Sequence, residues 1–105
     1  PVQNVLRIPV CGDFQGRNAA DIRDQIINCI DSGYHNIDVD LSETGLINAT
    51  GLGVLVSMQQ RLAQLGGNLT LRGVGKPLRL VFERTRLHHA FSISDKADSE
   101  EIPAK

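Results

Sequence analysis

Polar and apolar residues alternate with a period of two in three short stretches of the chain. These stretches are residues 6 to 10, 36 to 41 and 68 to 73. A period of two sends successive side chains to opposite faces of a sheet, so each stretch is predicted to be a strand with one buried and one solvated face. Pro9 cannot donate a backbone hydrogen bond, which places the first strand near an edge or at an irregularity. A second short strand is predicted at residues 12 to 15, paired with the first.

Between and after these strands, apolar residues recur at the spacing of an amphipathic helix. The first predicted helix spans residues 18 to 31, and its apolar side consists of Ile22, Ile26, Cys29 and Ile30. The second spans residues 51 to 65, and the residues on its inward side are Leu52, Leu55, Val56, Gln59, Leu62 and Ala63. The third runs from Pro77 to about Thr85, with an apolar side made of Leu78, Val81 and Phe82. Asn18 is predicted to cap the first helix and Gly33 to stop it. Gly66 and Gly67 are predicted to end the second. Cys29 is expected to be a buried, unreactive thiol.

A short helix or turn at residues 88 to 91 and a strand fragment at Ile93 complete the pattern, and the charged tail from residue 94 to 105 is predicted to fray. Strands that alternate with helices favour right-handed crossovers and parallel pairing. Because the strands are apolar on one face only, the helices are expected mainly on that face. The predicted fold is α/β, with a mixed, mostly parallel sheet of four to five strands, in a single domain with a core at about residues 4 to 93.

Charge and hydropathy narrow the classes of partner. The chain of 105 residues has a net charge of -1, so it lacks the basic field that nucleic acid or an anionic bilayer would require. Lys76, Arg79, Arg84 and Arg86 form its densest basic cluster, which Glu83 interrupts, and they are interpreted as a solvated helix face. No apolar stretch approaches the roughly 20 residues that span a bilayer. We expect a cytoplasmic protein that neither binds nucleic acid nor inserts into a membrane.

Candidate catalytic and metal-binding residues are sparse. Cys11 and Cys29 have neither metal-ligand nor redox spacing, so no metal or other cofactor is expected. Asp38 and Asp40 lie two residues apart on a predicted strand, where they are interpreted as part of a solvated sheet face rather than an acid and base pair. Arg7 and Arg72 are expected to neighbour these two carboxylates across the sheet. An enzyme is disfavoured.

The most informative segment runs from Asp40 to Leu55 and reads as a strand, a loop and the start of a helix. Asn48 or Thr50 can cap that helix by accepting a hydrogen bond from a free backbone amide, and the nearby glycines leave such amides accessible. A helix N-terminus carries a partial positive charge that tolerates a phosphate or a carboxylate. The segment is therefore suited to a phosphorylated hydroxyl or to an acidic group of a partner.

This segment resembles the signature of the STAS domain family, which includes anti-sigma factor antagonists and the cytoplasmic domains of sulfate transporters. Further landmarks follow in the expected order: Gly12-Asp13-Phe14, the stretch from Arg61 to Leu69, and the stretch from Val81 to Phe91. The resemblance covers roughly residues 4 to 93 and implies the α/β fold predicted above. It also implies a binding module that docks on an anti-sigma factor serine kinase, or a related STAS-binding protein, to release a sigma factor. It is compatible with a homodimer.

In the antagonist branch of the family, the loop reads Asp-Ser-Ser-Gly or Asp-Ser-Thr-Gly, and a kinase phosphorylates the hydroxyl residue after the Asp. The corresponding residues here are Asn48, Ala49, Thr50 and Gly51, so the acceptor position has no hydroxyl. Three alternatives stay open: Thr50 replaces the acceptor, the domain stays in its unmodified binding form, or it is a scaffold subunit of a larger signalling or transport assembly. The resemblance points to a partner-binding site made of Asn48, Ala49, Thr50, Gly51, Leu52 and Gly53, with Asp13, Gln15, Ser42 and Ser57 as further candidates.

Overall fold

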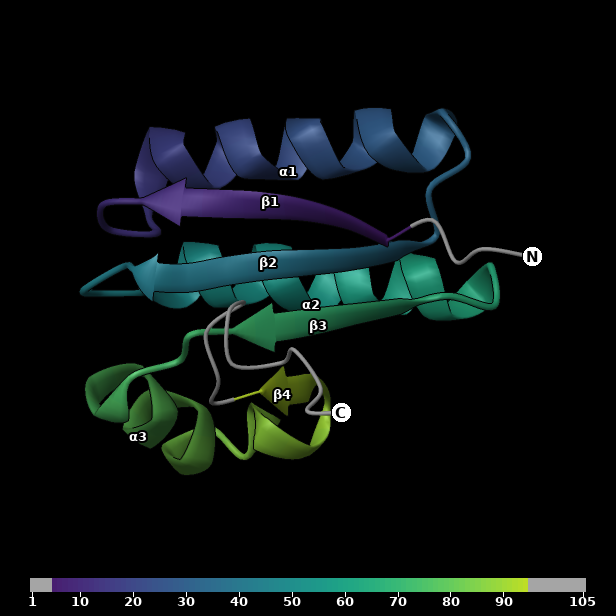
Figure 1. Ribbon diagram of the computed structural model, residues 1–105. Coiled ribbons are helices and arrows are strands. Elements are labelled where there is room, and N and C mark those ends of the chain that lie inside the picture. The colour runs from purple at the N-terminus through teal and green to yellow at the C-terminus, as the bar shows by residue number, and fades with distance from the viewer. Residues whose placement is uncertain (1–4, 95–105) are drawn as a thin grey trace, which may run out of the picture.

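The computed structural model describes residues 5–94, and the predicted tail beyond Ser94 lies outside that range. The elements in chain order are β1 (Val5–Cys11), α1 (Gly16–Asp31), β2 (Asn36–Glu43), α2 (Ala49–Gln64), β3 (Asn68–Arg72), α3 (Lys76–Arg84), the 3-10 helix η1 (Leu87–His89) and β4 (Ser92–Ser94) (Figure 1). The predicted alternation of strands and helices is confirmed.

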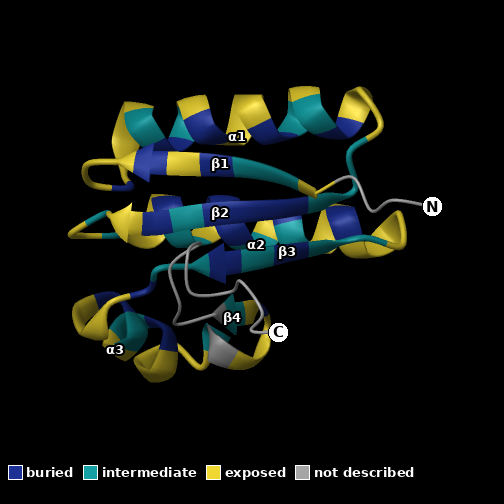
Figure 2. Ribbon diagram, in the orientation of Figure 1, coloured by how far each residue is buried: buried dark blue, intermediate teal, exposed yellow. Residues whose placement is uncertain are grey.

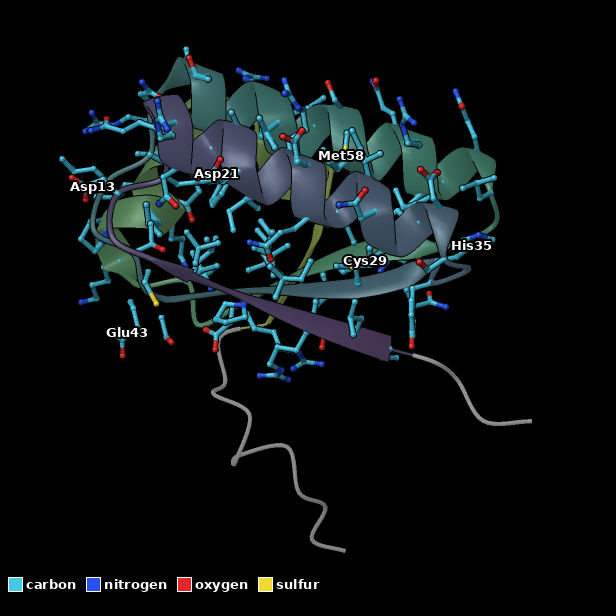
Figure 3. The ribbon with its side chains drawn as sticks, turned by 90° about the horizontal axis from the view of Figure 1, so that it is seen from above. Asp13, Asp21, Cys29, His35, Glu43 and Met58 are labelled. Carbon is cyan, nitrogen blue, oxygen red and sulfur yellow. The ribbon has the colours of Figure 1, made fainter. Side chains whose placement is uncertain are left out.

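The four strands form one sheet in the order β1-β2-β3-β4, and each pair of neighbours is parallel. This confirms the predicted α/β class. β1 is an edge strand, and its register with β2 shifts between Pro9 and Cys11. Parallel neighbours need a crossover between them: α1 connects β1 to β2, α2 connects β2 to β3, and α3 with η1 connects β3 to β4. Both α1 and α2 lie on the same side of the sheet, as expected from strands that are apolar on one face (Figure 3). All four strands therefore end at the same end of the sheet, here called its carboxyl end.

The core fills the space between this face of the sheet and the two helices (Figure 2). It contains Ile8, Val10, Ile37, Val39, Leu41, Leu69 and Leu71 from the strands, Ile22, Ile26 and Ile30 from α1, and Val54, Leu55, Met58 and Leu62 from α2. Each such side chain contributes about 1.5–3 kcal/mol when it is fully buried. On α2 the buried side includes Val54 and Met58, whereas Ala63, predicted to be apolar and inward, is exposed. The buried stripe is thus rotated slightly from the one predicted.

The opposite face of the sheet is polar, but one prediction about it is wrong. Asp38 is only 6% exposed instead of solvated. Its carboxylate accepts a hydrogen bond from Arg72 Nε and forms an ion pair with Arg7, whose Nη2 lies 3.6 Å from Asp38 Oδ2. The parallel register sets Arg7 directly beside Asp38, so these long side chains cover the carboxylate from water. The prediction that the two arginines neighbour these aspartates is confirmed.

Two local predictions near the start of the chain are also wrong. Residues 12 to 15 do not form a strand with β1; Phe14 instead makes an isolated parallel bridge with Ile47. Asn18 does not cap α1, because the helix begins before it, and its side-chain amide donates to the carbonyls of Cys11 and Asp13. The predicted end of α1 is confirmed, since Gly33 has a φ of 100° there.

Candidate functional site

The N-terminus of α2 is closed by a side-chain cap. Asn48 Oδ1 accepts a hydrogen bond from the Gly51 amide at 3.0 Å, and the Asn48 carbonyl accepts from the Leu52 amide at 2.9 Å. Of the two cap candidates predicted from the sequence, Asn48 is confirmed. Thr50 lies inside the first turn of α2 with an exposed side chain, so its hydroxyl is not the cap.

The two glycines of this turn differ in their surroundings. A Cβ atom at Gly51 would lie 2.2 Å from the Phe14 carbonyl oxygen, which no side chain can tolerate without a shift of the backbone. A Cβ atom at Gly53 would meet nothing within 4 Å. Gly51 is buried and packs the helix against the β1–α1 loop, so its role is structural rather than to expose amides as predicted. Gly53 lies on the exposed side of the helix.

The loop before α1 is joined to the loop before α2. The Phe14 amide donates to the Leu46 carbonyl at 2.8 Å, and the Leu46 amide donates to Asp13 Oδ1 at 3.2 Å. These bonds place the predicted candidate Asp13 beside the entry to α2. Gln15, the next candidate, is the N-cap residue of α1, and its exposed side chain makes no capping bond. Figure 3 shows Asp13 and Glu43 at this end of the molecule and His35 at the other.

The other two predicted candidates lie in different places. Ser42 is exposed at the end of β2, where its amide donates to Asp40 Oδ1 at 3.0 Å, so it belongs to the carboxyl end of the sheet. Ser57 is exposed on α2, eight residues after Ala49 and therefore about 12 Å along the helix axis at 1.5 Å per residue. The structure thus brings Asp13 beside the entry to α2, places Gln15 and Ser42 at the same end of the sheet, and leaves Ser57 two turns along α2.

Ser57 borders a separate feature that the sequence did not predict. A groove of about 580 Å³ runs between the C-terminal halves of α1 and α2, where Asp31, His35, Arg61 and Leu65 also line it. It lies at the opposite end of the sheet from the α2 cap. The groove and the cap are therefore distinct surfaces.

The first turn of α2 carries no charged side chain. It contains no acidic residue, and its outward side chains, Ala49 and Thr50, carry no charge. The amides of both residues have no carbonyl one turn back to bind, so the partial positive charge of the helix end faces outward. Such an end can receive a carboxylate or phosphate group from another molecule.

Leu46 belongs to this surface but was not singled out from the sequence. Its side chain is 61% exposed, directly before the turn into α2. Ile47 and Leu52 occupy the two positions of a hydrophobic staple around the Asn48 cap, and both are half-buried against the core. That staple pattern was a usable sequence signal: it assigns Ile47 inward and leaves Leu46 outward.

Cys29 is a titratable residue that lies away from the α2 cap. Cys29 is half-buried rather than fully buried as predicted, and this partial burial raises the pKa of its thiol. Within residues 5–94, no three His, Cys, Asp or Glu side chains come together in a way that could hold a metal ion. None of the helices in that range combines the length and apolar composition needed to cross a bilayer.

Comparison with known proteins is consistent with this geometry. The STAS domain profile matches residues 2–100 of the chain. The anti-sigma-B factor antagonist of Bacillus subtilis (strain 168) is 24% identical over 96 residues, which cover 91% of this chain and 87% of the relative. A crystal structure from Thermotoga maritima matches with a TM-score of 0.82 at 24% identity, covering 94% of this chain and 85% of that one. The anti-sigma factor antagonist SpoIIAA in its unphosphorylated form matches with a TM-score of 0.76 at 18% identity, covering 97% and 89%. Since the family profile spans nearly the whole sequence, this chain belongs to the STAS domain family.

Proposed function

We propose that this STAS domain is an anti-sigma factor antagonist-like module of bacterial signalling that acts in the cytoplasm. It binds an anti-sigma factor serine kinase through residues 48–53, here called the cap surface, and so releases a sigma factor. The observation that carries the proposal is the exposed, uncharged first turn of α2, in which Ala49 and Thr50 face outward beside the Asn48 cap. The curated relatives named anti-sigma-B factor antagonists support it.

The adjoining residues supply further contacts in this proposal. Asp13 lies beside the cap surface, Gln15 and Ser42 lie at the same end of the sheet, and Leu46 offers an apolar side chain directly before the cap. Ser57 extends the contact along the same helix. A small, rigid, uncharged helix end with one exposed leucine is a surface that a protein partner can cover closely.

Phosphorylation would oppose such docking. A phosphate adds about two negative charges and a desolvation cost at the interface, which ejects a module whose partner presents an acidic or apolar surface. Ala49 cannot receive it, because alanine has no hydroxyl. The domain therefore stays in the binding form unless Thr50, whose exposed hydroxyl is not used as the helix cap, accepts phosphate in its place.

The docking proposal is tested by adding charge without disturbing the fold. Ala49→Glu places a carboxylate at the first position of α2, where the helix dipole stabilises it by about 0.5 kcal/mol, so the variant should remain folded. We expect its affinity for the anti-sigma factor kinase of the same organism, measured by isothermal titration calorimetry, to fall at least about 10-fold. Ala49→Gln, which has the same size and no charge, is the matched control. Equal affinities for the two variants would contradict docking at this surface.

The role of Ala49 is tested by restoring the acceptor. Incubation with the kinase and ATP, followed by mass spectrometry, is expected to leave the wild-type chain unmodified and to place one phosphate on the Ala49→Ser variant. Thr50→Ala in both backgrounds serves as the control for the neighbouring hydroxyl. Stoichiometric phosphate on Thr50 of the wild-type chain would show that phosphorylation still controls the domain. It would overturn the proposal that the domain stays permanently in its binding form.

The alternative function is a scaffold subunit outside any kinase cycle, in a larger signalling or transport assembly. The observation that favours it is again Ala49, since a scaffold needs no acceptor. The two functions differ in their partner: purification from the source cell should bring down a small ATP-binding kinase for an antagonist and the fellow subunits of an assembly for a scaffold.

A further inference from the structure

The described charges are unevenly distributed along the chain. Residues 76–86 carry four cations and one carboxylate, a net charge of +3, whereas the rest of residues 5–94 carries five arginines and seven carboxylates, a net charge of -2. The cations of the segment are Lys76, Arg79, Arg84 and Arg86. The sequence alone suggested only a solvated helix face. The structure shows where that positive charge is placed.

One line of α3 combines this charge with an exposed apolar side chain. Lys76, Leu80 and Arg84 are four residues apart, so they follow one another along one side of the helix. All three are exposed, and Leu80 is 51% accessible. The opposite side of α3 is used in the core, where Leu78 and Phe82 are buried and Phe82 packs edge-on against Phe91 with 5.9 Å between ring centroids.

The position of α3 relates this line to the cap surface. α2 and α3 follow the adjacent parallel strands β2 and β3, so both helices begin at the carboxyl end of the sheet (Figure 1). The turn between β3 and α3 also touches the end of β2, since a Cβ atom at Gly73 would lie 2.7 Å from Ser42 Cβ. A partner that covers the α2 cap can therefore reach the start of α3 across Ser42.

We propose that Lys76, Leu80 and Arg84, here called the α3 surface, form a second contact for the same partner and select one with an acidic surface around an apolar pocket. This inference rests on the proposed function. Positive charge at the rim of an interface attracts an acidic protein and raises the rate of encounter, and Leu80 gains from burial in a pocket. An anionic membrane is the poorer occupant, because the apolar side of α3 is already buried and leaves Leu80 alone to insert.

The test compares variants of the α3 surface with matched variants at the far end of α2. Lys76→Glu, Arg84→Gln and Leu80→Ala are titrated against the anti-sigma factor kinase of the same organism by calorimetry. Arg61→Glu and Leu65→Ala are the controls, since Arg61 is exposed and Leu65 is 46% exposed at the opposite end of the sheet. Thermal melting followed by circular dichroism confirms that each variant is folded.

We expect Lys76→Glu and Leu80→Ala each to weaken binding about 10-fold, Arg84→Gln to weaken it about 5-fold, and the controls to change it less than 2-fold. The wild-type affinity should also fall as salt is raised, and less steeply for Lys76→Glu. Equal losses in the α3 and control variants would contradict the inference, since they would indicate only a general effect of charge.

The outcomes separate this inference from the function on which it rests. If the α3 variants bind as the wild type does while Ala49→Glu still weakens binding, the α3 contact is wrong and the function stands. If the wild-type chain does not bind the kinase, the proposed function itself fails. Co-sedimentation with phosphatidylserine vesicles that Leu80→Ala abolishes would assign the α3 surface to a membrane and overturn the protein contact.

Discussion

α1 and α2 are helices of 16 residues each that lie on the same face of the sheet and begin at the same end, yet their N-termini are built differently. α2 has a side-chain cap at Asn48, and a glycine in its first turn packs under the Phe14 carbonyl. α1 has Gln15 at its N-cap position, where no side chain caps the helix, and Gly16, its first residue, has a φ of 54°.

The difference concerns what each helix start is attached to. Asn18 ties the start of α1 to its own preceding loop through the carbonyls of Cys11 and Asp13. The start of α2 is fixed by a loop more than thirty residues earlier in the sequence, through Phe14 and Asp13. Contacts with the β1–α1 loop thus fix the N-terminus of α2 on its inward side, which leaves Ala49, Thr50 and Gly53 exposed on the outward side.

The largest expected effect is at the glycine that lets the two loops meet. Gly51→Ala forces a methyl group against the Phe14 carbonyl, and we expect a loss of about 2–3 kcal/mol in the free energy of unfolding. Gly53→Ala, two residues away in open space, should instead gain about 0.5–1 kcal/mol from helix propensity. Urea denaturation followed by circular dichroism measures both. Similar stabilities for the two variants would mean that the close contact does not fix the start of α2.

A smaller loss is expected at the start of α1. Gly16→Ala meets no neighbouring atom within 4 Å, so its cost comes only from the left-handed backbone and should be about 1–2 kcal/mol. Gly16→Asn tolerates that conformation better and should lose less. The same denaturation experiment tests the order of the two variants. If Ala and Asn are equally stable at this position, the backbone of α1 relaxes and its start is not strained.

The smallest expected loss of stability is at the N-cap positions of the two helices. Asn48→Ala removes the acceptor of the Gly51 amide and should cost about 1 kcal/mol, while Asn48→Asp should retain the cap. Gln15→Ala removes a side chain that makes no capping bond, so no measurable change is expected. Differential scanning calorimetry can resolve the two. A Gln15→Ala loss as large as that of Asn48→Ala would remove the contrast between the helix starts.

Much of the fold could be predicted because it depends on local patterns. Alternation in residues 36 to 41 and 68 to 73 predicted β2 and β3, and helical spacing around Ile22 and Ile26 predicted α1. The predictions were wrong where a residue contacts another that is distant in the sequence. Phe14 bridges Ile47 rather than β1, and Asp38 is covered by Arg7 and Arg72, side chains on two neighbouring strands.

In the candidate site, too, local features could be predicted and long-range contacts could not. Asn48 could be recognised as a cap, and Ala49 as a position without a hydroxyl, because both properties belong to the residue type and its place before an apolar helix. That Gly51 is needed for contact with Phe14 and that Asp13 reaches the α2 entry could not be predicted from the spacing of residues. Each depends on two loops meeting in space.

The order of strands and helices, the polar face of the sheet and the chemistry of the α2 cap could all be predicted, since they follow from side-chain periodicity and residue type over a few positions. Three features depend on the tertiary fold: which loop supports the cap, that α3 begins at the same end of the sheet as α2, and that Ser57 lies two turns along α2. Parallel pairing joins segments that are separated by whole helices, and such contacts leave no periodic signal in the chain.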